Sequence, residues 1–260
     1  MITISIFRLL LALLLVLVPI YFFRIFRVSL IRSTLISTLR MVVQMSLIGV
    51  YLEFLFSLNN GWVNFLWFCV MVMVAASTAV SRTRLRARLM LMPVAVGLAT
   101  GALVVGLYAL VGVLGLHNPF DARYFIPLMG ILLGNMLGGN VLSLTTFYQG
   151  LQREHQLYYY LLGNGATRLE ALTPFIRRAI EKAFLPCVAN MAVMGLVSFP
   201  GTMIGQILGG ATPDVAVRYQ MLIVFITFCA PMLSLIVTLY LAHRASFDEY
   251  GRLREVMRRG

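Results

Sequence analysis

Charged residues are scarce in this sequence. Only 12% of its 260 residues are Asp, Glu, Lys or Arg, whereas 60% are hydrophobic and the mean hydropathy is +0.91. A soluble domain carries about 25% charged residues, and a buried core does not account for so large a deficit. We therefore expect an all-α, polytopic membrane protein.

The sequence also lacks the motifs of the common membrane-embedded and ATP-hydrolysing enzymes. It has no HExxH, no GxSxG and no pair of Asp residues in its apolar segments, which argues against intramembrane proteases. Its one lysine, Lys182, is not part of a Gly-Lys-Ser/Thr sequence, so no phosphate-binding P-loop is present. Cys69, Cys187 and Cys229 lie at unrelated spacings in apolar stretches and favour neither a zinc site nor a disulfide framework. We expect a non-catalytic subunit.

Seven apolar stretches are long enough to cross a bilayer, which takes about 20 residues. The first is interpreted as a retained helix, because no A-x-A cleavage site follows it and its basic residues come after the apolar run. The predicted spans are residues 5–23, 41–58, 62–80, 91–115, 125–147, 184–209 and 218–241.

The cations are distributed unevenly between the connecting segments. Seven spans place four segments on one side of the membrane, and these hold 18 of the 21 Lys and Arg residues: 24–40, 81–90, 148–183 and the tail after 241. Positive residues concentrate on the cytoplasmic side. This predicts the N-terminus outside and the C-terminus inside, and it explains the net charge of +12 without a nucleic-acid partner.

Residues 148–183 form the only long polar interruption, and we expect them in the cytoplasm. Gly163 and Gly165 flank Asn164 and predict a turn between two helices. Thr167 or Asn164 is a candidate cap for the second helix, and Glu170 three residues after Thr167 fits a capping box. Arginines of the segment, such as Arg168, either pair with acidic groups of a partner or form a face exposed to solvent and lipid headgroups.

The fifth predicted span carries a stripe of small residues, Gly130, Gly134 and Gly138, at a spacing that lets two membrane helices approach closely. Asn135 lies within this stripe, and Gln44 lies in the second span. An amide in lipid must find a polar partner or line a wet cavity. Both roles, polar contact between helices and lining of a pathway, remain open.

The sixth predicted span is irregular. Its Pro200-Gly201 pair predicts a broken or kinked helix, and broken helices at mid-membrane depth often line a substrate site. Nearby methionines are either core packing or soft metal ligands. The further polar and thioether residues of this stretch are Asn190, Met194, Ser198, Met203 and Gln206.

Two parts of the sequence carry a resemblance to a known family. The segment GNGATRLEALTPFIRRAIEKAFLP at 163–186 resembles the segment by which ABC-transporter permeases dock onto their ATPase. Together with MGLVSFPGTMIGQILGG at 194–210 and RMVVQ at 40–44, it is similar to the FetB iron-export permease family, which includes plant aluminium-sensitivity proteins. Family members commonly have methionine where this chain has Thr202.

The resemblance implies a single permease domain over residues 1–260 that exports iron or another metal from the cytoplasm across a bacterial cytoplasmic (inner) membrane. It implies a homodimer of such chains in the bilayer, joined to separate ATP-binding cassette subunits that bind ATP and Mg, with no cofactor in this chain. ATPase contact falls on Gly163, Asn164, Gly165, Ala166, Thr167, Arg168 and Glu170. The expected substrate path contains Gln44, Asn135, Asn190, Met194, Ser198, Pro200, Gly201, Met203 and Gln206; its metal ligands are unknown.

Two other functions remain open from the residues alone. A secondary transporter or channel that works without ATP would use ionisable groups such as Glu53 to couple ions. Those groups lie near the span ends, and seven spans do not divide into two equal repeats. A structural membrane scaffold leaves the broken sixth span without a purpose.

Overall fold

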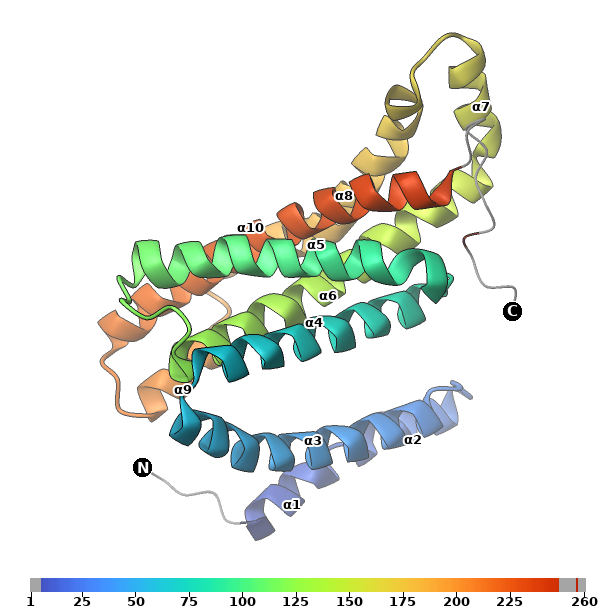
Figure 1. Ribbon diagram of the computed structural model, residues 1–260. Helices are drawn as coiled ribbons and strands as arrows, with labels where there is room; N and C mark the ends of the chain where they lie inside the picture. The colour runs from blue at the N-terminus through green and yellow to red at the C-terminus, as the bar shows by residue number, and fades with distance from the viewer. Residues whose placement is uncertain (1–5, 248–255, 257–260) are drawn as a thin grey trace. The chain divides into compact units, whose positions relative to one another are not determined.

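The computed structural model describes residues 6–247 and Val256, and within this part of the chain it contains helices and no named β-strand (Figure 1). This confirms the all-α prediction. The chain divides into two compact units. Unit 1 comprises Met1–Asn59 with Leu208–Gly210, and unit 2 comprises Asn60–Ile207 with Ala211–Gly260.

Unit 1 is built from three helices: α1 (Ile6–Leu14), α2 (Leu17–Ile25) and α3 (Ile31–Leu58). A short turn at Leu15–Val16 separates α1 from α2, so the predicted span 5–23 is two nine-residue helices in its described part and not one continuous helix. Apolar side chains from all three helices line a cavity of about 310 Å³ within the unit.

Unit 2 contains the remaining helices. They are α4 (Gly61–Thr83), α5 (Ala87–Leu107) with its π-helical continuation Tyr108–Val113, α6 (Ala122–Arg153), α7 (His155–Gly163), α8 (Arg168–Val193), α9 (Gly201–Leu208) and α10 (Pro213–Ser246). Among these, α4, α5, α6 and α10 run alongside one another as a bundle (Figure 1), with extensive packing of α5 against α10 and of α4 against α5 and α6.

Five of the described helical segments are long and apolar enough to cross a membrane: α3, α4, α5 with its continuation, α6 and α10. They contain the second, third, fifth and seventh predicted spans and nearly all of the fourth. The sixth predicted span, 184–209, is divided between the end of α8 and the short helix α9. The total of seven spans and the orientation stay predictions.

Glycines on α5 bring this helix against α10. A Cβ atom added at Gly97 would lie 2.0 Å from the Thr238 hydroxyl oxygen and 2.7 Å from the Ser234 carbonyl oxygen. One added at Gly101 would lie 2.8 Å from the Ala230 carbonyl oxygen. Two backbones therefore meet at a distance that only glycine permits.

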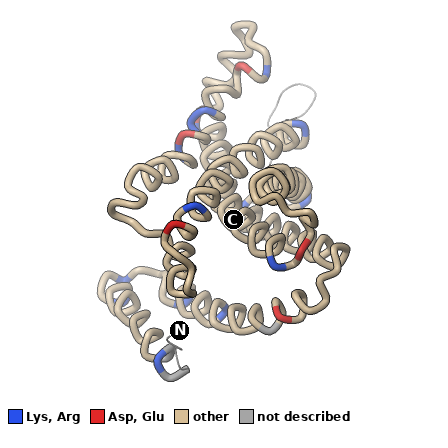
Figure 2. Tube along the Cα trace, turned by 90° about the vertical axis from the view of Figure 1, so that its left-hand side faces the viewer, with Lys and Arg blue, Asp and Glu red and all other residues tan. Residues whose placement is uncertain are grey.

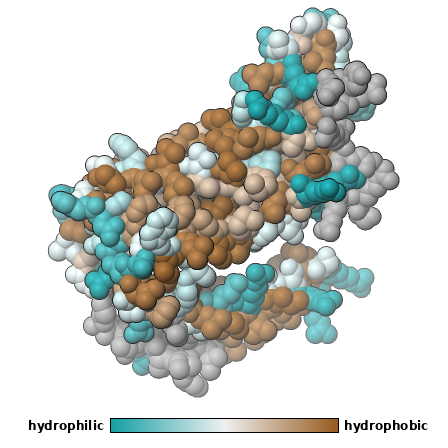
Figure 3. Space-filling model, in the orientation of Figure 1, coloured by the Kyte–Doolittle hydropathy of each residue, from teal (hydrophilic) through white to brown (hydrophobic). Residues whose placement is uncertain are grey.

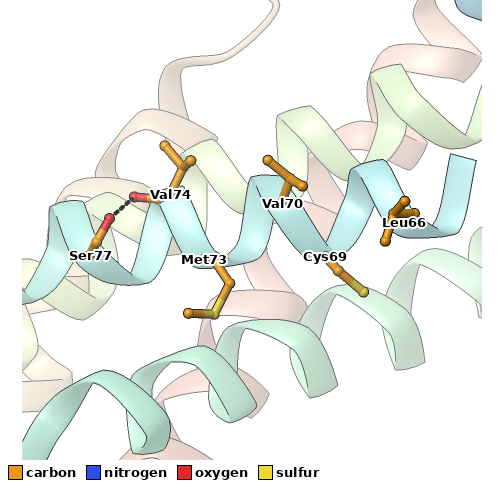
Figure 4. A pocket seen from close by; sticks show the side chains of 6 residues that line it. All are labelled: Leu66, Cys69, Val70, Met73, Val74 and Ser77. Carbon is orange, nitrogen blue, oxygen red and sulfur yellow. Dashed lines mark hydrogen bonds between the residues drawn. The ribbon is translucent and has the colours of Figure 1, made fainter. Parts of the chain in front are cut away.

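The flanks of the helices are apolar. Figure 3 shows hydrophobic residues over the middle of the helices of unit 2, with hydrophilic residues near their ends. A shallow groove runs along α4 and is lined by Leu66, Cys69, Val70, Met73, Val74 and Ser77 (Figure 4). Its only hydroxyl, Ser77, donates to the Val74 carbonyl of the same helix. The groove is a lipid-compatible surface and presents no free polar group from its side chains.

Charged residues are sparse along the trace and mark the helix ends and the α7–α8 segment (Figure 2). In unit 2, Arg82 and Arg84 lie at the end of α4, Arg86 precedes α5, and Arg153 ends α6. The structure thus brings cations from separate connectors to one end of the bundle, which we call the basic end.

Candidate coupling hairpin and broken sixth span

Helices α7 and α8 form a hairpin that projects beyond the basic end of the bundle (Figure 1). The two helices meet at a turn, and we call residues 163–170 the hairpin tip. The hairpin does not begin and end at the boundaries of the polar segment 148–183, because α6 continues to Arg153 and α8 continues to Val193. The hairpin is therefore joined to the bundle through helix on its α8 side, without a flexible linker.

The turn depends on one glycine. Gly165 has φ +88°, in the left-handed region that side chains disfavour. Gly163 is the last residue of α7 and lacks a positive φ, so the left-handed step of the predicted turn falls on Gly165 alone. Asn164 is the C-cap residue that follows α7, and its side-chain amide donates to the Tyr160 carbonyl over 2.7 Å.

Helix α8 begins with a complete capping box, and Thr167 is the cap. The Glu170 amide donates to the Thr167 hydroxyl, and Oε2 of Glu170 accepts from the Thr167 amide over 2.7 Å and from its hydroxyl over 2.8 Å. These hydrogen bonds from Thr167 lower the pKa of Glu170 below its ordinary value, because they favour the charged carboxylate. The tip therefore has a defined shape although it is exposed.

The hairpin contacts the end of α10 through Phe247. The Phe247 ring is buried and lies 5.7 Å from the ring of Tyr158 on α7 and 5.4 Å from that of His243 on α10, centroid to centroid. The Arg168 guanidinium lies 6.0 Å from the same ring. The hairpin is thus connected to the bundle both along α8 and, through Phe247, to the end of α10.

An ion pair closes the base of the hairpin. Arg178 of α8 donates to Glu154, the residue between α6 and α7. Arg177, its neighbour in sequence, pairs instead with Glu181 on the exposed face of α8, with an N–O distance of 3.0 Å. Pairs at this exposure contribute about 0–1 kcal/mol each, so they orient the arms more than they stabilise the fold.

The sixth predicted span is broken, as its Pro200-Gly201 pair predicts, but the helix ends earlier than the proline. Helix α8 ends at Val193, and Gly195 then takes φ +86°. The Gly195 amide donates to the Ser198 carbonyl over 2.9 Å, and the Val197 amide donates to the Val193 carbonyl over 3.0 Å. The chain turns back on itself here and restarts as α9 at Gly201.

Thr202 donates a hydrogen bond from its hydroxyl to the Gln220 side chain of α10. Gln220 is 8% exposed and ties α9 to the seventh predicted span. Our sequence reasoning did not select Gln220. A lone amide within an apolar stretch was the available signal, the same signal that identified Gln44 and Asn135.

The structure brings only some of the predicted path residues together. Met194, Ser198, Pro200, Gly201, Met203 and Gln206 lie in and just after the break, and Asn190 lies one turn before it on α8. Asn135 is exposed on α6, and its amide donates to the Ile131 carbonyl. Gln44 lies on α3 in unit 1. Within residues 6–247 and Val256, no three His, Cys, Asp or Glu side chains gather as a metal site.

Comparisons with known proteins agree with this architecture. A family profile, described as "Uncharacterised protein family (UPF0014)", matches residues 6–247. A UPF0014 membrane protein of Synechocystis is 30% identical over 216 residues, which are 82% of this chain and 83% of that protein. No solved structure matches the chain.

Two further relatives have more specific names. The Escherichia coli "Probable iron export permease protein FetB" is 29% identical over 243 residues, 94% of this chain and 92% of that protein. The Arabidopsis thaliana "Protein ALUMINUM SENSITIVE 3" is 30% identical over 219 residues, 84% of this chain and 78% of that protein. The similarity therefore extends over nearly the whole chain and is not confined to its apolar segments.

Proposed function

This chain belongs to the UPF0014 family, and from that premise we propose that it is the permease subunit of an ABC transporter. It is an integral, multi-pass membrane protein with five long apolar helices in its described part. The proposed transporter exports iron or another metal across the cytoplasmic membrane of a bacterium, with ATP and Mg bound by a separate ATPase subunit. The relative named as an iron export permease supports the cargo and the direction.

One observation carries the proposal: the chain has no P-loop, yet it presents a rigid helical hairpin at its basic end. A permease that cannot hydrolyse ATP needs a stiff surface through which an ATPase acts. The capped tip, with the exposed side chains of Tyr160 and Leu169 beside it, has that character. We assign ATPase contact to the tip residues Gly163 to Arg168 and to Glu170.

The same geometry suggests how movement reaches the substrate path. Helix α8 is continuous from the tip at Arg168 to Val193, directly before the break. A rotation of the hairpin by the ATPase would therefore move Met194 and Ser198, and through Phe247 it would also act on α10. The path residues Gln44, Asn135, Asn190, Pro200, Gly201, Met203 and Gln206 are assigned to the same function because they are polar or thioether residues in apolar spans or form the Pro-Gly pair.

A homodimer accompanies this proposal. Gly134 and Gly138 on α6 have no heavy atom within 4 Å of the position where a Cβ would stand. Within the described part of unit 2 they are therefore not used for close packing, unlike Gly97 and Gly101. We assign this open stripe to contact with a second copy of the chain.

The cargo must suit a membrane path that is poor in carboxylates. Bare Fe³⁺ is a hard cation that prefers several carboxylate ligands. The only acidic residue in the predicted spans is Glu53. We infer that the metal crosses as a chelate or with transient backbone carbonyl ligands at the break. The ATPase rate of the reconstituted complex, measured with free metals and with their chelates, distinguishes these forms.

Co-purification tests the core of the proposal. A tagged chain, expressed in its native host and solubilised in mild detergent, should carry an ABC ATPase with it, and the complex in liposomes should move metal only with ATP. The proposal is overturned if the chain purifies alone and supports an ion-driven flux without ATP, as the secondary transporter or channel would.

Replacement of Gly165 by valine tests the assignment of the tip. The substitution forces a β-branched residue into a left-handed conformation, so we expect ATP hydrolysis to continue while the metal moved per ATP falls. Gly49→Ala is the control, because Gly49 lies within helix α3, outside the tip, and has no described atom within 4 Å of its Cβ position. Unchanged coupling in Gly165→Val would contradict a docking role for the turn.

A further inference from the structure

A polar cleft of about 180 Å³ lies between α6 and α8 at the base of the hairpin. It is distinct from the tip and from the broken span. Unlike the apolar groove along α4, its lining is about as polar as it is apolar. The side chains that matter are Thr146, Gln149 and Arg153 from α6, and Phe175, Arg178 and Lys182 from α8.

The cleft holds more positive than negative charge. Glu154 is its one carboxylate, and it is engaged by Arg178. Among the residues that the structure describes, no carboxylate lies within ion-pairing distance of Arg153 or Lys182. Two cations thus face one concave site without a counter-charge from the described part of the chain.

The donors around these cations fit an anion with several oxygen atoms. Lys182 offers three N–H donors and Arg153 a planar guanidinium, while the Thr146 hydroxyl and the Gln149 amide can donate as well. The buried ring of Phe175 closes the cleft from the protein side. Phosphate, with its exposed oxygens, matches this donor set.

Size and depth favour a lipid as the source of the phosphate. The predicted spans end at 147 and begin again at 184, so Thr146 and Lys182 lie at the expected boundary between hydrocarbon and headgroups. A space of about 180 Å³ holds a headgroup phosphate, whereas a helix of a protein partner is about 10–12 Å across. Basic pockets between membrane helices bind anionic headgroups.

We propose that this cleft binds the phosphate of an anionic phospholipid through Arg153 and Lys182, with Thr146 and Gln149 as further donors. The bound lipid occupies the angle between α6 and α8 and braces the base of the hairpin. This inference does not rest on a transport function, because it concerns only the charge, the shape and the membrane depth of the cleft.

Lipid rebinding to the full-length, delipidated protein tests the proposal. Phosphatidylglycerol, phosphatidylcholine or inorganic phosphate is added back in neutral detergent, and bound lipid is measured by native mass spectrometry. We expect phosphatidylglycerol to bind in preference to phosphatidylcholine. Affinity should fall about fivefold in Arg153→Gln and in Lys182→Gln, which corresponds to about 1 kcal/mol for each cation near the membrane surface.

Arg177→Gln is the matched control, because Arg177 lies on the same helix and pairs with Glu181 outside the cleft; its lipid affinity should not change. Lys182→Arg keeps the charge and should keep binding, which separates loss of the site from loss of the fold. Equal binding of both lipids, or equal losses in Arg177→Gln and Lys182→Gln, overturns the proposal.

Two other results also overturn it and identify a different occupant. Saturable binding of inorganic phosphate with no preference between the lipids would assign the cleft to free phosphate. Retained phosphatidylglycerol binding in both cleft variants, with loss of a co-purifying protein, would assign these cations to a protein partner.

Discussion

The hydroxyl oxygen of Tyr148 lies 2.7 Å from that of Ser246, and both side chains are buried. Tyr148 is on α6 and Ser246 is the last residue of α10, so this hydrogen bond joins two long helices at the basic end. The Met90 sulfur of α5 lies 3.6 Å from the same Tyr148 oxygen. Three helices thus meet at one polar contact beneath the hairpin.

Removal of the Tyr148 hydroxyl should destabilise the protein. In Tyr148→Phe the buried Ser246 hydroxyl loses its partner, and we expect a loss of about 1–3 kcal/mol of unfolding free energy, measured by denaturation in detergent. Adding Ser246→Ala to Tyr148→Phe should restore part of the lost stability, because no buried hydroxyl then lacks a hydrogen-bond partner. Tyr160→Phe, on an exposed residue, is the control; additive losses in the double variant would contradict a direct bond.

The two sets of glycines should respond differently to alanine. Gly97→Ala places a methyl group against the Thr238 hydroxyl and the Ser234 carbonyl, and overpacking of this kind costs about 1–3 kcal/mol. Gly134→Ala meets no described atom of unit 2 within 4 Å and should leave the packing of unit 2 unchanged. If Gly134 lies in a dimer contact, a larger Gly134→Leu change should lower the dimer fraction in chemical crosslinking.

These glycines illustrate what the sequence could predict and what it could not. Spacing alone selects Gly130, Gly134 and Gly138 as a packing stripe, yet the close approach within the chain is made by Gly97 and Gly101 on α5. A stripe of small residues reveals that a helix can be approached closely. It does not reveal whether the partner is a helix of the same chain, because that depends on how all the helices pack together.

Predictions made from a few neighbouring residues were more reliable than predictions of helix continuity made from the length of an apolar run. The capping box at Thr167 and Glu170 and the break near Pro200 are set by neighbouring residues, and both appear in the structure. Helix continuity was harder to predict. In the apolar run 5–23, Pro19 has no N–H to donate to the Leu15 carbonyl and lies in the first turn of α2, so the helix is interrupted at Leu15–Val16. A sum of hydropathy over the run does not register this interruption.

The start of α8 should depend on pH through Glu170. Its pKa is lowered in the folded state, so the carboxylate stabilises the cap above the ordinary pKa of a glutamate, and this contribution is lost as the pH falls through the lowered value. Amide exchange at residues 168–171, corrected for intrinsic rates, should show protection that persists at neutral pH and decreases in acid.

Two variants separate the cap from general acid effects. Thr167→Ala removes the capping hydroxyl and should reduce this protection at all pH values, by about 1 kcal/mol at neutral pH. Thr173→Ala, whose hydroxyl bonds to the Leu169 carbonyl within α8, should leave it unchanged. Protection that decreases equally in Thr173→Ala would show that the cap does not hold the tip.

Because the sixth predicted span is broken, we expect alanine to have opposite effects on stability at two of its glycines. Gly195 has φ +86°, so Gly195→Ala forces a side chain into the left-handed region at a cost of about 1–2 kcal/mol. Gly205 lies inside α9 with no atom near its Cβ position, so Gly205→Ala should stabilise that helix by about 0.5–1 kcal/mol. Thermal unfolding of both variants in the same detergent gives the comparison. If the helix instead continued through residue 195, Gly195→Ala would stabilise the protein, because alanine is the better helix former. Such stabilisation would show that the chain does not turn at Gly195.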